Sequence, residues 1–154
     1  LCRMTLLQIN EQFKTVTDAV AGLNGKSFGM PSDRTRSQTY DEPGEDQTDL
    51  FPRVFFVVPD FDHNTVTRKD EYDCQVFFDD LLGYDDDGES NPMTQVEKWS
   101  MLSVYVEQWV KEMQKNITTG KVQGIVKVEL NSFGLKQRLI YAKATFTFVT
   151  SAVC

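Results

Sequence analysis

The sequence has few of the residues on which most enzymatic and metal-binding sites depend. Its 154 residues include three cysteines and a single histidine, His63. The cysteines, Cys2, Cys74 and Cys154, lie far apart, so no C-x-x-C pair is available for a zinc knuckle or a thioredoxin-type motif. We therefore expect free thiols in a reducing compartment rather than a structural disulfide.

Long apolar runs and an excess of basic residues are also missing. The longest apolar stretches, such as Val54–Val58, are far shorter than the roughly 20 residues of a membrane-spanning helix. The N-terminus leads directly into a polar helical pattern, so we expect no signal peptide. The net charge of −7 argues against broad binding to nucleic-acid phosphates, although an acidic wall could let DNA pass without adhering.

The N-terminal segment has the apolar periodicity of an amphipathic helix. Apolar residues recur at spacings of three and four from Leu6 to Leu23. Thr5 and Gln8 fit a capping box at its start, and Gly25 is the expected stop. Because the apolar stripe is narrow, we expect this helix to lie across a flat surface such as a sheet.

A second helical pattern begins at Asn91-Pro92, with proline at the first helical position, and ends near Asn116. Its two tryptophans make it the expected anchor of the core. The apolar stripe consists of Val96, Trp99, Leu102, Val106, Trp109 or Val110, and Met113.

Four segments predict strands: Val54–Val58, Tyr72–Phe78, Lys121–Asn131 and Arg138–Thr150. Apolar and polar residues alternate in the last three, which indicates one core face and one wet face. The predicted fold is a single α+β domain over residues 1–154, in the order α-β-β-α-β-β. An antiparallel sheet of about four strands would be covered by two helices.

Two stretches lack this periodicity. Residues 26–50 are rich in Gly, Pro, Ser, Thr and acidic side chains, and predict an irregular acidic loop within the domain. A loop of this size is either a mobile linker or an arm that folds against a neighbouring subunit. Asp60–Asp70 holds turn formers and predicts a projecting loop or an extended hairpin tip.

The acidic run after the second predicted strand can be compared with a calcium-binding loop. Aligning the obligatory glycine with Gly88 puts Asp85 and Asp87 at ligand positions. The first and twelfth positions, which should be carboxylates, are then Gly83 and Thr94. The run is therefore interpreted as a solvated acidic turn.

No other group of residues predicts catalysis. Asp60, Asp62 and His63 could meet a metal, but such residues are commonplace in a polar loop. Asp79 and Asp80 are adjacent on a strand and should point to opposite faces, so they are interpreted as charges that end the strand at a turn. We therefore predict no catalytic residues, no cofactor and no metal site, and a protein that is not an enzyme.

The order of the elements and several phrases resemble a known family. An N-terminal helix and a variable acidic loop precede "LFPRVFFVVPD" and "EYDCQVFFDDLL"; "QVEKWSMLSVYVEQWVKEM" and a closing "ATFTFVTSAVC" follow. This pattern resembles the tail terminator, or neck ring, proteins of tailed bacteriophages. It is most similar to small virion proteins of phages that infect Bacteroidales, the crAss-like group included. The resemblance covers most of the chain, except Lys26–Asp49.

The resemblance implies a structural virion protein at the head–tail junction, assembled in the host cytoplasm. Identical subunits would form a sixfold or twelvefold ring that docks portal, connector or tail proteins, and double-stranded DNA would pass through it without sequence-specific binding. No membrane is implied. The residues expected to contact other subunits or partners are Phe61, His63, Asn64, Arg68, Lys69, Phe133 and Leu135.

Three alternatives remain open from the sequence. Within the same class, the chain could form the tail tube or another connector ring. A cytosolic adaptor could bind a peptide along a sheet edge. A small metal-dependent hydrolase would use Asp60, Asp62, His63 and the run Asp85–Glu89.

Overall fold

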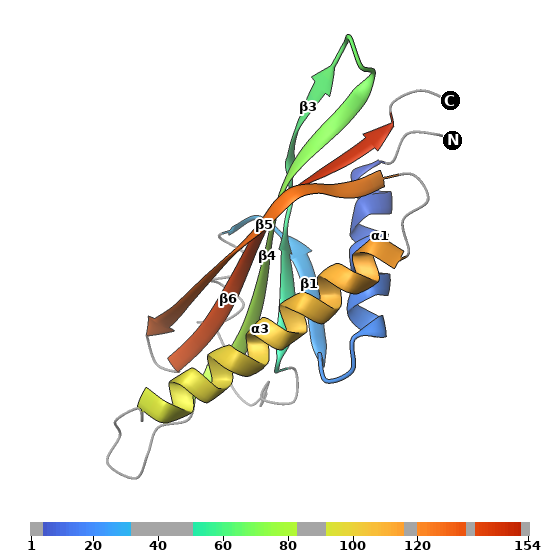
Figure 1. The fold of residues 1–154 in the computed structure, drawn as a ribbon. Coiled ribbons are helices and arrows are strands. Elements are labelled where there is room, and N and C mark those ends of the chain that lie inside the picture. Colours follow the sequence, from blue (N-terminus) through green and yellow to red (C-terminus); the bar gives the residue numbers. More distant parts are fainter. Residues whose placement is uncertain (1–4, 32–50, 83–91, 116–119, 135–137, 152–154) are drawn as a thin grey trace.

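The computed structural model describes residues 5–31, 51–82, 92–115, 120–134 and 138–151 (Figure 1). These residues form two long helices and a sheet of six strands, which confirms the α+β class. The elements are α1 (Leu6–Ala19), β1 (Gly25–Gly29), β2 (Arg53–Val57), β3 (Asp60–Asn64), β4 (Lys69–Leu82), α3 (Pro92–Lys115), β5 (Gly120–Gly134) and β6 (Arg138–Ser151).

The sheet has the strand order β1-β2-β4-β6-β5, and β3 pairs with β4 beyond the end of β2. All neighbours are antiparallel except β1 and β2, which are parallel. Both helices lie on the same face of the sheet (Figure 1). The prediction of an antiparallel sheet of about four strands is therefore wrong in strand count and in the direction of β1. The predicted order α-β-β-α-β-β is also wrong, because four strands rather than two lie between the helices.

One additional strand, β1, lies where the sequence predicts an irregular loop, and the other, β3, lies where it predicts a projecting loop or an extended hairpin tip. β1 occupies the start of the 26–50 stretch, and β3 occupies the start of the predicted projecting segment. Neither has a run of β-branched residues, so local propensity does not reveal them. Pairing with β2 and β4 stabilises them instead, since strand formation depends strongly on cross-strand context.

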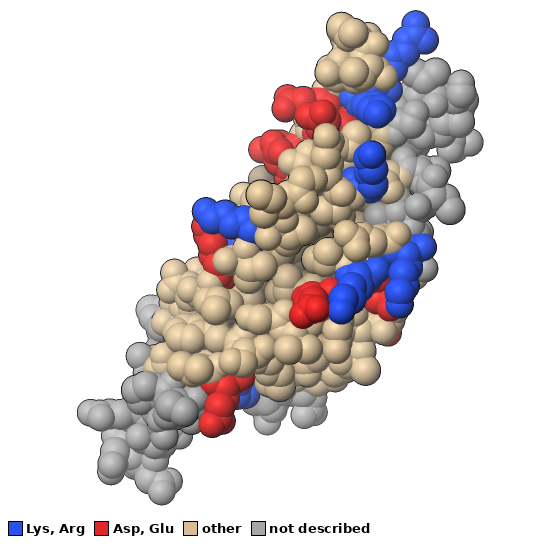
Figure 2. All heavy atoms as spheres, viewed as in Figure 1, with Lys and Arg blue, Asp and Glu red and all other residues tan. Residues whose placement is uncertain are grey.

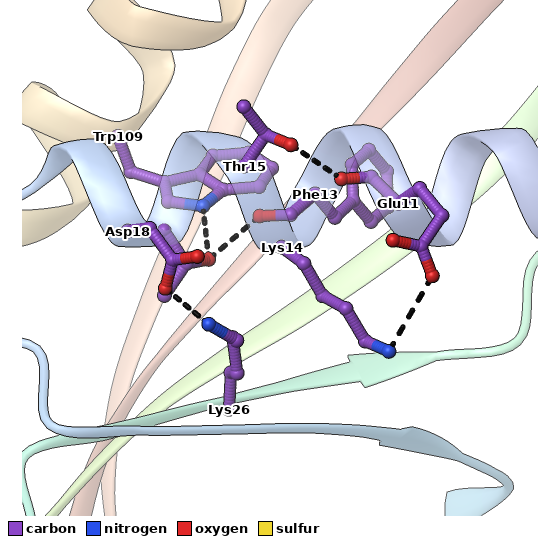
Figure 3. Close-up of polar contacts among 8 residues, drawn as sticks. Glu11, Phe13, Lys14, Thr15, Asp18, Lys26 and Trp109 are labelled. Carbon is purple, nitrogen blue, oxygen red and sulfur yellow. Dashed lines mark hydrogen bonds and ion pairs between the residues drawn. The ribbon is translucent and has the colours of Figure 1, made fainter.

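The core lies between the two helices and one face of the sheet. Trp109 is fully buried, and its ring centroid lies 5.4 Å from that of Phe13 and 5.8 Å from that of Phe146. The indole Nε1 donates a hydrogen bond to Thr17 Oγ1 at 3.1 Å, and this hydroxyl donates to the carbonyl of Phe13 at 2.8 Å (Figure 3). Each buried polar group in this chain of contacts therefore has a partner.

The predicted core positions are largely confirmed. Tyr72, Cys74, Val76 and Phe78 are buried on β4, and Ile140, Ala142, Ala144, Phe146 and Phe148 are buried on β6. The prediction that Val96 belongs to the buried stripe of α3 is wrong, because its side chain is 51% exposed. Val128 and Leu130 are also about half exposed, because β5 is the edge strand and α3 does not cover it fully.

The first helix has the predicted start but ends earlier than expected. The capping box is present: Thr5 Oγ1 accepts from the amide of Gln8, and Gln8 Oε1 accepts from the amide of Thr5. The helix ends at Ala19, and the chain turns through Gly22 at φ +95°. This turn brings Lys26 of β1 to Asp18 of α1, which form an ion pair (Figure 3).

Asp79 and Asp80 point to opposite faces of β4, as predicted, but they do not end the strand, which continues to Leu82. Both are buried. Asp79 Oδ2 lies 3.6 Å from Arg53 Nε of β2, and Asp80 Oδ2 lies 3.1 Å from Lys98 Nζ of α3. These carboxylates therefore join β4 to its neighbours, because a buried charge is tolerated only when it is paired. The acidic run that follows lies outside the described residues.

Candidate functional site

The predicted interaction residues fall into two groups. Phe61, His63 and Asn64 lie on β3, Arg68 in the following turn and Lys69 at the start of β4, and this hairpin projects from the end of the sheet (Figure 1). Phe133 lies near the end of β5, where only the backbone is described, and Leu135 lies outside the described residues.

The structure does not bring the two groups together. Lys69 pairs with Ser151 at one end of the β4–β6 ladder, whereas Phe133 pairs with Leu139, which lies opposite Leu81 at the other end. At about 3.3 Å per residue, the two groups are roughly 40 Å apart. They could therefore contact different neighbours but not form one site.

Local side-chain contacts shape the hairpin turn. Asn64 Oδ1 accepts hydrogen bonds from the amides of Val66 at 3.0 Å and Thr67 at 2.9 Å. Arg68 then adopts φ +54°, the left-handed conformation that reverses the chain into β4. The turn contains no glycine or proline, so its clearest signal in the sequence is Asn64, whose amide can replace backbone hydrogen bonds in a turn.

The helix-facing side of the hairpin carries two cross-strand pairs. His63 Nδ1 lies 2.6 Å from Asp70 Oδ1, and Asp70 is fully buried. The rings of Phe61 and Tyr72 lie 5.3 Å apart, and Phe61 stays 45% exposed. These contacts hold β3 against β4 while leaving part of an aromatic surface open to a partner.

The opposite side of the hairpin carries four carboxylates and one lysine, Lys69, so its net charge is negative. Asp60 lies directly opposite Asp73, and Asp62 lies directly opposite Glu71, and all four side chains are exposed. Like charges directly opposite each other on one face of a sheet are unfavourable. This face of a single chain would therefore gain from a neighbouring positive charge.

The alternation of side chains along β3 separates His63 from Asp60 and Asp62, the three residues of this segment that the hydrolase alternative would use. Asp60 and Asp62 point away from the helices, whereas His63 points to the helix side and pairs with Asp70. Among the residues that the structure describes, no group of three or more His, Cys, Asp or Glu side chains is placed to hold a metal ion. These three side chains therefore do not converge on one point, as the alternative of a metal-dependent hydrolase would require.

The sheet is four strands wide at the hairpin, in the order β3-β4-β6-β5. The registers align residues in rows across these strands. One row is Asp62, Glu71, Val149 and Lys121, and the next is Phe61, Tyr72, Phe148 and Val122. At this end, therefore, β3 and the first residues of β5 form the two edges of the same sheet.

The β5 edge, defined as Gly120–Gln123, is exposed at Lys121 and Gln123. The register with β6 shifts immediately after Gln123, where Gly124 has φ +75° and Ile125 is 89% exposed. Such a bulge interrupts the ladder and bends the strand. The sequence alone does not predict this edge, because the alignment of its residues depends on registers with distant strands.

Beyond the bulge, β5 carries a local ion pair on its surface. Lys127 Nζ lies 2.8 Å from Glu129 Oε1. The hydrogen bond and charge of Glu129 raise the pKa of Lys127, and Lys127 in turn lowers the pKa of Glu129. The two charges balance each other, so this part of the strand adds no net charge.

A weakly charged area lies beside this strand, over α3 (Figure 2). Met101 and Val104 of α3 are exposed apolar side chains. Figure 2 also shows acidic and basic side chains close together at the projecting end of the molecule. Within the described part of the chain, no helix is long and apolar enough to cross a membrane.

The sequence matches no protein-family model, and the comparison with curated proteins finds no similar protein.

Proposed function

We propose that this protein is a structural subunit of a tailed-bacteriophage virion and forms a ring at the head–tail junction. The ring would extend the DNA channel and dock portal, connector or tail proteins. Its first partner would be a second copy of the same chain, and double-stranded DNA would pass through it without sequence-specific contacts.

One observation supports this proposal most: the projecting end of the sheet has two different exposed edges, β3 and the β5 edge. A closed ring needs heterologous contacts, in which each subunit offers two distinct surfaces to its two neighbours. Strand edges are suited to this role, because their unpaired backbone groups can extend the sheet. The resemblance of the sequence to tail terminator proteins supports the same proposal.

The charge of the chain fits a channel component. The net charge of −7 disfavours tight binding to DNA phosphates. A wall of like sign repels the duplex and would keep it from adhering during passage. A tail-tube or other connector ring would use the same edges, so the ring is the common element of these proposals.

A second candidate is a peptide-binding adaptor, and the exposed β5 edge favours it. An extended peptide can add to such an edge by main-chain hydrogen bonds. The two proposals differ in what the free protein does: the ring subunit associates with itself, whereas the adaptor remains a monomer until it meets a peptide.

Imaging of purified phage particles tests the location. We expect density at the head–tail junction into which α1, α3 and the six-stranded sheet fit as repeated copies around the channel. Particles that lack this protein, or that carry it as a single copy away from the channel, would contradict the proposal.

A further inference from the structure

We infer that β3 of one copy pairs with the β5 edge of a second copy, so that the sheet continues from subunit to subunit. This inference rests on the proposed ring and names its interface. The occupant of each edge is a second copy of this chain.

The strand directions allow this pairing. β3 is antiparallel to β4, β4 to β6, and β6 to β5, so β3 and β5 run in opposite directions. When two copies are placed side by side with their helices on the same side, β3 of one copy therefore meets β5 of the next as an antiparallel neighbour. Antiparallel addition needs no change in either strand.

The rows across the sheet specify the register. Continuing each row into the next copy without a shift places Asp62 opposite Lys121 and Phe61 opposite Val122. Directly opposite residues on one face of an antiparallel pair have Cβ atoms about 5 Å apart, close enough for their side chains to interact. The contact residues of both edges thus lie at the same position along the strand direction.

The charges of the two edges are complementary. Lys121 lies in the same row as Glu71 and Asp62, and so on the helix-free face where the hairpin carries four carboxylates. Among the described residues, neither Asp62 nor Lys121 has an ion-pair partner within its own chain. A Lys121 from the neighbouring copy would relieve the repulsion between the opposed acids.

The helix-facing side offers a matching apolar contact. Phe61 is 45% exposed in the single chain, and Val122 is half-buried at the opposite edge of the same row. Placing Val122 of the next copy beside Phe61 removes apolar surface from water on both sides, which favours association.

The lengths of the two edges differ by only one residue. β3 consists of five residues, and the β5 edge ends after Gln123, where the register shifts. Asp60 would face Gln123, and His63 would face Gly120, before the hairpin turn and the bulge end the pairing. A short segment between two interruptions restricts sheet addition to one register, which limits open-ended aggregation.

A charge swap tests this pairing. In Asp62→Lys, two lysines would face each other across the interface, and in Lys121→Glu, two carboxylates would. Each substitution should raise the concentration for half-maximal assembly at least about tenfold, because like charges at an interface oppose association. Assembly is measured by light scattering after size-exclusion chromatography, and circular dichroism checks that each variant is folded.

The rescue is the decisive part of the experiment. Asp62→Lys/Lys121→Glu restores opposite charges at every interface and should assemble like the wild type. An equimolar mixture of the two single variants should also assemble, because in a ring of alternating copies every interface again joins one lysine to one carboxylate. Lys111→Glu and Glu97→Lys on α3 make the same charge changes away from the edges and should leave assembly unchanged.

The outcomes separate the interface from the function. If the wild type forms a ring and the single variants assemble equally well, the proposed pairing is overturned while the ring function stands. Loss of assembly without rescue in the double variant or the mixture also overturns it. A wild type that stays monomeric at every concentration overturns the proposed function, and the interface with it.

Discussion

Buried carboxylates on β4 are matched with basic side chains from three different elements. This pattern follows from the cost of removing a charge from water, which a hydrogen-bonded partner offsets. The sequence correctly places two of the acids on opposite faces but suggests only charges that end the strand at a turn, because it does not specify which neighbours cover the strand. The pairs are Asp70–His63, Asp79–Arg53 and Asp80–Lys98.

At the residue scale, His63 should matter for stability rather than for chemistry. His63→Ala removes one hydrogen bond from the fully buried Asp70 carboxylate, and should lower the free energy of unfolding by about 1–3 kcal/mol. Asp62→Asn, at the neighbouring exposed position, should change it by less than about 0.5 kcal/mol. Urea denaturation of both variants measures the difference, and equal effects would contradict the assigned role of the pair.

Cys74 should behave as an inert thiol. Burial, reinforced by the charge of Asp73, raises the pKa of Cys74 to about 12. In a Cys2→Ser/Cys154→Ser variant at pH 8, a thiol reagent should label Cys74 only when denaturant is added, as followed by mass spectrometry. Rapid labelling of the native protein would contradict the buried placement.

The same thiol gives a pH dependence of stability with a defined sign. The unfolded chain loses the Cys74 proton above about pH 8.5, whereas the folded chain keeps it until about pH 12. The unfolded state therefore binds fewer protons in this range, and the contribution of Cys74 to stability falls as the pH rises through it. Comparing urea midpoints of the Cys74→Ala variant and its parent between pH 8 and 10 isolates this contribution.

At the element scale, two glycines shape β5 for different reasons. A Cβ on Gly120 would lie 2.6 Å from the ring of Phe148 and 3.0 Å from a backbone oxygen, whereas a Cβ on Gly124 would meet no atom within 4 Å. Gly124 instead has φ +75°, which disfavours side chains whatever the space. The start of β5 is thus limited by packing, and the bulge by backbone conformation.

Substitutions at these glycines should separate the two causes. Gly120→Ala should lower the free energy of unfolding by about 1–3 kcal/mol through overpacking, and Gly124→Ala by about 1–2 kcal/mol through strain. Asparagine, which adopts positive φ more readily than alanine, should recover part of the loss at 124 but not at 120. Thermal unfolding measures all four variants, and equal recovery at both positions would contradict this assignment.

The sequence predicts the elements with strong periodicity and misses those that depend on tertiary pairing. α3 has the predicted bounds, and the alternation of β4 and β6 gives the correct core face, because each buries a regular apolar stripe. β1 and β3 lack such a stripe. The alignment of Asp62 with Lys121 depends on three separate strand registers, which residue periodicity does not specify.

At the scale of the whole molecule, one sheet carries both the stable core and the proposed interfaces. The two helices cover one face along the middle of the sheet, and the hairpin extends beyond them (Figure 1). β3 contributes no residue to the hydrophobic core, so its sequence can serve contacts with a neighbour without a loss of packing. This division of roles agrees with a subunit whose function depends on assembly.

The most direct test of the central claim is the mass of the wild-type protein in solution, measured by light scattering over a wide concentration range. We predict a closed species of six or twelve times the 17.6 kDa chain, in a concentration-dependent equilibrium with smaller forms. A constant mass of 17.6 kDa at all concentrations would contradict self-assembly through the sheet edges.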